Sequence, residues 1–133
     1  MNNRKLGNTF EQDLCDLLYG YGFWAKNLKQ DSAGQPADII AVRNGKAYLI
    51  DAKVCSDGKF PLSRVEENQQ LAMDMWESCG NGQGWFAMKL PMGEVYMIPH
   101  FYIKAYTNVQ SALTAAEIHE LGKPLGKWVS RCK

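Results

Sequence analysis

The sequence predicts one mixed α/β domain, in which helices cover both faces of a central mixed sheet. The length of 133 residues, 46% of them hydrophobic, suits a single domain with a core of its own. Helix-spaced and strand-like apolar patterns follow one another in the order α-β-β-α-β-β-α. The strand-like runs are apolar on both faces, which is typical of a sheet that is covered on both sides.

The first helix is expected to begin at Thr9 and to end at Gly20. Thr9-Phe10-Glu11-Gln12 has the S/T-x-x-E/Q form of a capping box, and Gly20 and Gly22 interrupt the pattern that follows. The apolar residues that follow helical spacing are Phe10, Leu14, Leu17, Leu18 and Tyr21. The polar segment 27–36 is then expected to form a loop.

A β-hairpin is expected next, with strands over residues 37–42 and 47–54. Asn44-Gly45 lies between them, and Asn-Gly between apolar runs is a strong hairpin signal because both turn residues need positive φ. A two-residue loop at this point pairs residues whose numbers sum to 89. The hairpin therefore has a defined register.

The second half of the expected fold contains a helix and two strands. Ser63-Arg64-Val65-Glu66 has the capping-box form and is expected to open a helix that ends near Ser78. Strands are expected over residues 85–90 and 95–99, on either side of the turn 91–94.

The C-terminal part is expected to add one short helix. Thr114-Ala115-Ala116-Glu117 is a third capping box, and Gly122 should end the helix that it opens. The single domain 1–133 would then consist of a core over residues 4–106 and a C-terminal helical extension over residues 107–133.

Composition excludes several classes of protein. The net charge of +1 argues against disorder and is a weak signal for nucleic-acid binding. No apolar run approaches the roughly 18 residues of a membrane span, and the first residues lack the apolar core of a secretory signal, so a cytoplasmic location is expected. The four cysteines form no CxxC pair and there are two histidines, which disfavours a zinc site.

The hairpin register brings acidic side chains together. Asp38 would lie opposite Asp51, with Lys53 on the same face because side chains alternate along a strand. Like charges at opposed positions destabilise a sheet, so something must compensate for them. A divalent cation is one candidate, since Mg²⁺ is held by one or two carboxylates with waters and phosphate oxygens. A strand end in which Lys53 pairs with Asp51 is the alternative.

Two further polar residues are expected on apolar helix faces. Glu11, in the first turn of the first helix, borders the apolar face, whereas Asp13 and Asp16 should point to water. Gln69 should point inward and Gln70 outward. Glu11 could alternatively serve the helix dipole, and Gln69 could be a structural amide with satisfied hydrogen bonds.

These residues resemble the signature of a known superfamily. Pro36-Ala37-Asp38, with Asp51-Ala52-Lys53 beginning thirteen positions after Asp38, resembles the PD-(D/E)xK motif of metal-dependent nucleases. The segments 5–11 and 60–69 resemble those that carry the superfamily's site Glu and Gln. The similarity extends over about residues 4–100 and is greatest to Holliday junction resolvases of the RecU and archaeal types. Asp51 stands where resolvases more often have Glu, and Pro36 precedes Asp38 by two positions rather than one.

The resemblance implies a restriction-endonuclease-like core and a Mg²⁺-dependent endodeoxyribonuclease of recombination and repair. Asp38, Asp51, Glu11 and the backbone carbonyl of Ala52 would hold Mg²⁺, for which Mn²⁺ could substitute. Lys53 would position or help to deprotonate the attacking water, and Gln69 would orient Lys53 or the water. The candidate DNA contacts near the site are Arg4, Lys5, Lys26, Lys29, Ser32, Lys59 and Arg64.

Two other functions remain open at this point. One is a nuclease acting on other branched or duplex DNA, and the other is a DNA-binding module that does not cleave. A resolvase acting on a four-way junction is expected to be associated with the nucleoid in the cytoplasm. It is also expected to be a homodimer, because two symmetric nicks need two sites. The aromatic residues expected at its interface are Trp24, Trp85, Trp128, Phe101, Tyr102 and Tyr106.

Overall fold

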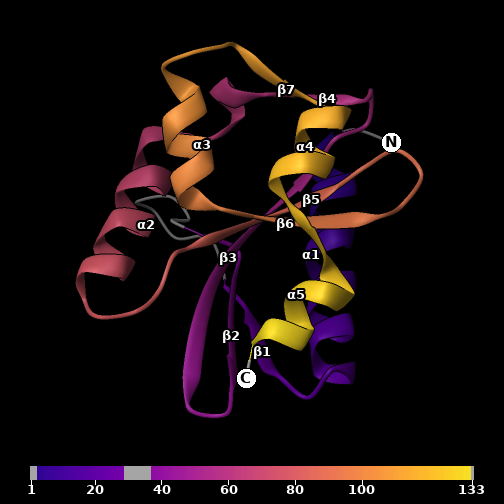
Figure 1. The fold of residues 1–133 in the computed structure, drawn as a ribbon. Helices are drawn as coiled ribbons and strands as arrows, with labels where there is room; N and C mark the ends of the chain where they lie inside the picture. The colour runs from indigo at the N-terminus through magenta and orange to yellow at the C-terminus, as the bar shows by residue number, and fades with distance from the viewer. Residues whose placement is uncertain (1–2, 29–36, 133) are drawn as a thin grey trace.

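The computed structural model describes residues 3–28 and 37–132, with the side chains of its first helix from Thr9 onward (Figure 1). Its main sheet has six strands in the order β1-β2-β3-β5-β6-β8. These strands are β1 (Trp24–Asn27), β2 (Ile39–Arg43), β3 (Lys46–Val54), β5 (Trp85–Lys89), β6 (Val95–Pro99) and β8 (Lys123–Pro124). β3 and β5 run parallel and the other neighbouring pairs are antiparallel, so the sheet is mixed, as predicted.

The remaining elements surround this sheet. The helices are α1 (Asn3–Gly20), α2 (Glu67–Ser78), α3 (His100–Thr107), α4 (Ala115–Leu121) and α5 (Leu125–Arg131). A 3-10 turn η1 (Leu62–Arg64) precedes α2, and the short strands β4 (Lys59–Pro61) and β7 (Ala112–Thr114) form a separate two-stranded ribbon. None of the helices in the described residues is long and apolar enough to cross a membrane.

Helices cover both faces of the sheet, as the two-sided apolar strands predicted. α1 and α5 pack on one face, where Leu14 and Trp128 belong to the same buried cluster as Ile50 of β3. α2 and α3 pack on the other face, where Met73 of α2 lies in a cluster with Leu49 of β3 (Figure 1). Ile118 of α4 belongs to this second cluster as well. Alternate residues of β3 therefore enter two separate cores.

The hairpin register agrees with the prediction. Arg43 pairs with Lys46, Ile40 with Leu49 and Ile39 with Ile50. The two loop residues have positive φ, 55° at Asn44 and 78° at Gly45, as a type I′ turn requires. The register places position 38 against position 51, although the paired ladder ends at Ile39.

Two of the predicted helix starts are wrong. α1 begins at Asn3, so Thr9 lies inside the helix and the proposed capping box there does not exist. Residues 62–64 form the 3-10 turn, and α2 begins only at Glu67, with Glu66 as its N-cap. The third box is confirmed, because Thr114 accepts a hydrogen bond from the N–H of Glu117. Short S/T-x-x-E matches arise by chance when no tertiary contact supports them.

The structure contains elements that the periodicity did not reveal. β1, β4, β7 and β8 have four residues or fewer, too few for a periodic signal. α3 and α5 were also missed, and residues 107–133 are more than a helical extension. β7 pairs with β4, β8 pairs with β6, and Trp128 of α5 is a core residue.

Most of the aromatic residues expected at a dimer interface serve the core of the single chain. Trp128 is 2% exposed, and Trp85 packs partly buried against the same cluster. Tyr102 and Tyr106 are partly buried against the cluster on the other face. Trp24 and Phe101, at 54% and 53%, are exposed as an interface would need.

Candidate active site

Asp51 lies in the middle of β3, between β2 and β5, and its side chain is fully buried. Asp38 immediately precedes β2 and is attached to β3 through two hydrogen bonds. Its N–H donates to the carbonyl of Ile50 at 3.1 Å, and its Oδ2 accepts from the N–H of Ala52 at 2.7 Å. The carboxylate of Asp38 thus accepts a hydrogen bond from the residue that follows Asp51, and this contact holds the two acids next to each other.

Lys53 and Gln69 complete a connected cluster around Asp51. The Nζ of Lys53 lies 3.1 Å from Oδ2 of Asp51 and donates to Oε1 of Gln69 at 3.3 Å. The Nε2 of Gln69 donates to Oδ1 of Asp51 at 3.4 Å. Lys53 also donates to the backbone carbonyl of Arg64 at 3.2 Å, so the 3-10 turn before α2 helps to aim its ammonium group.

Gln69 can face the sheet because of its place in α2. It is the third residue of the helix, and its Oε1 accepts the otherwise free N–H of the N-cap Glu66 at 3.1 Å. Its two amide ends therefore have different tasks: the carbonyl end holds the helix start and Lys53, and the NH₂ end reaches Asp51. The prediction that Gln69 points inward is confirmed.

Both carboxyl groups have raised pKa values. Burial is the largest cause for Asp51, followed by the charge of Asp38, and together they raise the pKa of Asp51 well above its ordinary value although Lys53 acts in the opposite direction. Burial also raises the pKa of Asp38 to about 6, and the charge of Glu11 adds to the rise. Ionising both acids is therefore costly unless a positive charge lies beside them.

The donor set around Asp51 suits a hard cation. Oδ2 of Asp51 is buried, and the ammonium of Lys53 lies beside it at an ion-pair distance of 3.1 Å. The described residues include no group of three His, Cys, Asp or Glu arranged to hold a metal. The site thus presents a carboxylate pair, which fits Mg²⁺ because that ion keeps several waters and phosphate oxygens as ligands.

Glu11 lies near Asp38 but not where the sequence placed it. It is the ninth residue of α1 rather than part of its first turn, so the alternative role at the helix dipole is wrong. Its side chain is half-buried, whereas Asp13 and Asp16 are exposed as predicted. Its charge and a side-chain hydrogen bond both raise the pKa of Asp38, which identifies it as a neighbour of the acidic pair.

The prediction that Gln70 faces outward is wrong. Its Oε1 lies 3.1 Å from Nε2 of His100, a residue that is 3% exposed. Successive helix residues are about 100° apart, so a helix held between a sheet and a second helix can use two adjacent positions for contacts. Because α3 was not predicted from the sequence, its residue His100 was not expected beside α2, and the partner of Gln70 was missed.

The candidate DNA contacts are only partly described. Lys26, Lys59 and Arg64 are exposed. Arg64 donates from Nη1 to the carbonyl of Val54 at 2.6 Å and lies over the ring of Phe60, with 5.2 Å from Cζ to the ring centroid. The side chains of Arg4 and Lys5, and the whole of Lys29 and Ser32, lie outside the described residues.

Two contributors to the site had no sequence signal. The carbonyl of Arg64 acts through the main chain, which any residue could supply. His100 follows Pro99 at the end of a strand, and nothing local marks it as a partner of α2. α3 begins at His100 and has eight residues, and its apolar pattern is too weak to predict a helix there. The buried position of the His100 imidazole therefore could not be predicted either.

A mixed sheet flanked by helices, with one carboxylate just before β2 and a second carboxylate and a lysine on the neighbouring β3, is the arrangement of a restriction-endonuclease-like nuclease domain. The chain belongs to the archaeal Holliday junction resolvase (Hjc) family, whose model matches residues 1–125. This confirms the resemblance to PD-(D/E)xK nucleases and selects its archaeal branch.

A solved structure has the same fold. The Holliday junction resolvase Hjc from the archaeal hyperthermophile Archaeoglobus fulgidus superposes with a TM-score of 0.72 at 18% sequence identity, covering 92% of this chain and 99% of that chain. A search among curated proteins finds no match.

Proposed function

We propose that this chain cuts DNA four-way junctions as a Mg²⁺-dependent endonuclease, with Asp38, Asp51, Lys53, Gln69 and Glu11 as its active site. Membership of the Hjc family supports a junction-resolving DNA endonuclease of the hydrolase class. The observation that carries the assignment of the site is the fully buried Asp51 carboxylate, held between Asp38, Lys53 and Gln69. Such an enzyme would act in recombination and repair where the DNA is, in the cytoplasm.

Asp38 and Asp51 would hold Mg²⁺, and Mn²⁺ could take its place. Glu11 and the carbonyl of Ala52 would be further ligands, and Glu11 would have to turn toward the pair, because the three carboxylates form no metal-binding group among the described residues. A cation bound there would lower the pKa of a water and offset charge on the phosphate. Asp38 and Asp51 would ionise when it binds, because a positive charge opposes the burial that now raises the pKa of both.

Of the described residues, Lys53 is the one best placed to face the attacked phosphate. Asp51, Gln69 and the carbonyl of Arg64 fix its ammonium beside the carboxylate pair, and it would exchange one of these contacts for a water or a phosphate oxygen. Gln69 links Lys53 to Asp51 through its two amide ends and would keep both in one orientation. Lys26, Lys59 and Arg64, which are exposed, would contact DNA phosphates.

The experiment that tests this proposal compares substrates under different cations. Labelled four-way junctions, flaps, single strands and plain duplex are incubated with Mg²⁺, Mn²⁺ or EDTA. We expect paired incision of the four-way junction with either cation and none with EDTA. Preferred cutting of flaps or duplex would favour a nuclease of another substrate class, and binding without cutting would favour the DNA-binding module.

We also propose that the working enzyme is a homodimer, since one site cannot make two opposed nicks without rebinding. Two regions of the described surface carry exposed apolar side chains that an interface could use. Leu17, Tyr19, Tyr21 and Trp24 lie from the end of α1 to β1, and Leu71, Met75 and Phe101 lie on α2 and α3. Light scattering over a dilution series should give the mass of a dimer. Leu17→Asp should produce a monomer if the first set of side chains forms the interface, and Met75→Asp should do so if the second set forms it.

A further inference from the structure

The position of α2 decides whether Gln69 reaches Lys53 and Asp51. Of the twelve residues of α2, all of them described, Met73 is the one that is fully buried. Met73 packs where β5 approaches: a Cβ on Gly84 would lie 1.8 Å from its Sδ. One buried side chain does not fix the rotation and sliding of a helix, so further contacts must hold α2.

His100 offers a rigid point of attachment beside α2. It is 3% exposed, and its backbone N–H donates to the carbonyl of Gly84 at 2.9 Å. Its ring lies against Phe86, with 6.1 Å between centroids. Phe86 is the register partner of Asp51 on the neighbouring strand, so His100 is one layer away from the acidic pair.

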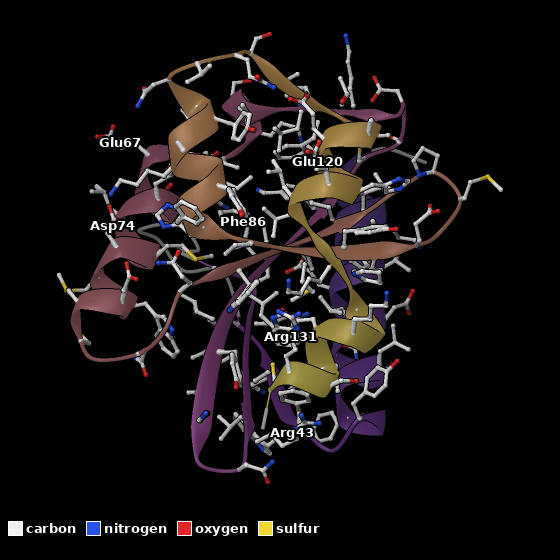
Figure 2. The ribbon with its side chains drawn as sticks, in the orientation of Figure 1. Arg43, Glu67, Asp74, Phe86, Glu120 and Arg131 are labelled. Carbon is white, nitrogen blue, oxygen red and sulfur yellow. The ribbon has the colours of Figure 1, made fainter. Side chains whose placement is uncertain are left out.

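Gln70 connects α2 to this point. Its Oε1 lies 3.1 Å from Nε2 of His100, and it follows Gln69 directly in the chain. Asp74, one turn further along, lies 3.7 Å from Nδ1 of His100 and 3.0 Å from Nζ of Lys104, so it extends the contact between α2 and α3 to the surface (Figure 2). The exposed pair of Asp74 and Lys104 contributes little by itself, whereas the buried amide–imidazole contact is shielded from water.

We propose that Gln70 and His100 are positioning residues, which hold α2 in the register that lets Gln69 meet Lys53 and Asp51. The inference rests on the proposed function of that site. A helix advances 1.5 Å per residue, so a shift by a fraction of this rise would break the contacts of 3.3 and 3.4 Å that Gln69 makes. The hydrogen bonds to Lys53 and Asp51 are made by Gln69 and not by Gln70. Gln70 therefore acts through Gln69.

The test is a double-mutant cycle on the intact chain, measured as single-turnover cleavage of a four-way junction with Mg²⁺. Gln70→Ala and His100→Phe should each lower the single-turnover rate constant of cleavage by about five- to ten-fold, with little change in the concentration that gives half the maximal rate. Gln70→Glu, which retains an acceptor for His100, should be close to wild type. Lys104→Ala is the matched control, because it breaks another contact between α2 and α3, and its rate constant should be unchanged.

The cycle separates positioning from a general loss of stability. In a Gln69→Ala background, Gln70→Ala should cause no further loss, because the residue through which it acts is already gone. An equal loss in both backgrounds, or full activity of Gln70→Ala, would overturn the inference. Thermal melting checks that each variant is folded.

A second measurement keeps the inference testable if the wild type cuts no DNA. The side-chain amide NMR signals of Gln69, assigned by their loss in Gln69→Ala, should shift or broaden in Gln70→Ala and stay in place in Lys104→Ala. Unchanged signals in Gln70→Ala would contradict the positioning role. Absence of cleavage with shifted signals would contradict the proposed function alone.

Discussion

Asp51 combines a fully buried carboxylate with an acidic neighbour, which costs stability when no cation is bound. Replacing it by Asn keeps its shape and removes the charge. We expect Asp51→Asn to abolish cleavage and to leave the thermal midpoint in EDTA unchanged or higher. In wild type, Mg²⁺ should raise the midpoint, because a ligand that binds only the folded chain stabilises it, whereas in Asp51→Asn it should not. A midpoint that rises equally in both proteins would place the cation elsewhere.

Asp38 makes the metal-free stability depend on pH. Its pKa is raised from 3.8 to about 6, so between these values the folded chain binds more protons than the unfolded chain. The free energy of unfolding should therefore fall as pH rises through this interval, by on the order of 3 kcal/mol from this group. Denaturant unfolding in EDTA from pH 4 to 7 should show the fall in wild type and a weaker one in Asp38→Asn. Parallel curves of unfolding free energy against pH for the two proteins would contradict the assignment of this pH dependence to Asp38.

The sequence predicted the acidic site better than its surroundings, and the reason is geometric. A two-residue Asn-Gly loop determines which residues face each other, so Asp38, Asp51 and Lys53 followed from counting. Gln70 did not, because helical spacing says which way a side chain points and not what packs there. Its partner His100 lies thirty positions away in the chain.

Among the elements of the fold, α2 is the one whose position depends most on a close approach, here between Met73 of the helix and Gly84 before β5. Gly84→Ala would put a methyl group against the buried Met73 and push the helix from the sheet. Overpacking of this kind costs about 1–3 kcal/mol. We expect a lower thermal midpoint together with a reduced cleavage rate, measured by melting and by single-turnover cleavage. Gly82→Ala is the control, because nothing lies within 4 Å of a Cβ there. A similar effect of both substitutions would argue against the close approach.

Helix and strand boundaries show where local sequence is insufficient. Thr114 and Glu117 form a real capping box because the chain turns there from β7 into α4, whereas Thr9 lies inside a helix that begins six residues earlier. The short strand β8 exists because it pairs with β6, a tertiary contact with no local pattern. Such elements depend on partners that are distant in the chain.

In the molecule as a whole, Arg43 joins the hairpin to the C-terminal helix (Figure 2). Its guanidinium donates to the carbonyl of Val129 in α5 and to that of Cys132 just after this helix. It also donates to the carbonyl of Tyr21 after α1 and lies 4.4 Å from the ring centroid of Phe23. We expect Arg43→Ala to lose about 2–3 kcal/mol of unfolding free energy, and Arg43→Lys to recover little, because lysine lacks the planar fork. Denaturant unfolding measures both. A lysine variant as stable as wild type would show that charge alone is sufficient.

Whether Asp51 is the centre of a metal-dependent nuclease site is tested most directly by single-turnover incubation of a labelled four-way junction with wild type and with Asp51→Asn, in Mg²⁺ and in EDTA, with binding measured on the same samples. We expect wild type to cut opposed strands in Mg²⁺ alone, and Asp51→Asn to bind the junction with similar affinity without cutting it. Cleavage by Asp51→Asn at the wild-type rate, or cleavage by wild type in EDTA, would contradict this assignment.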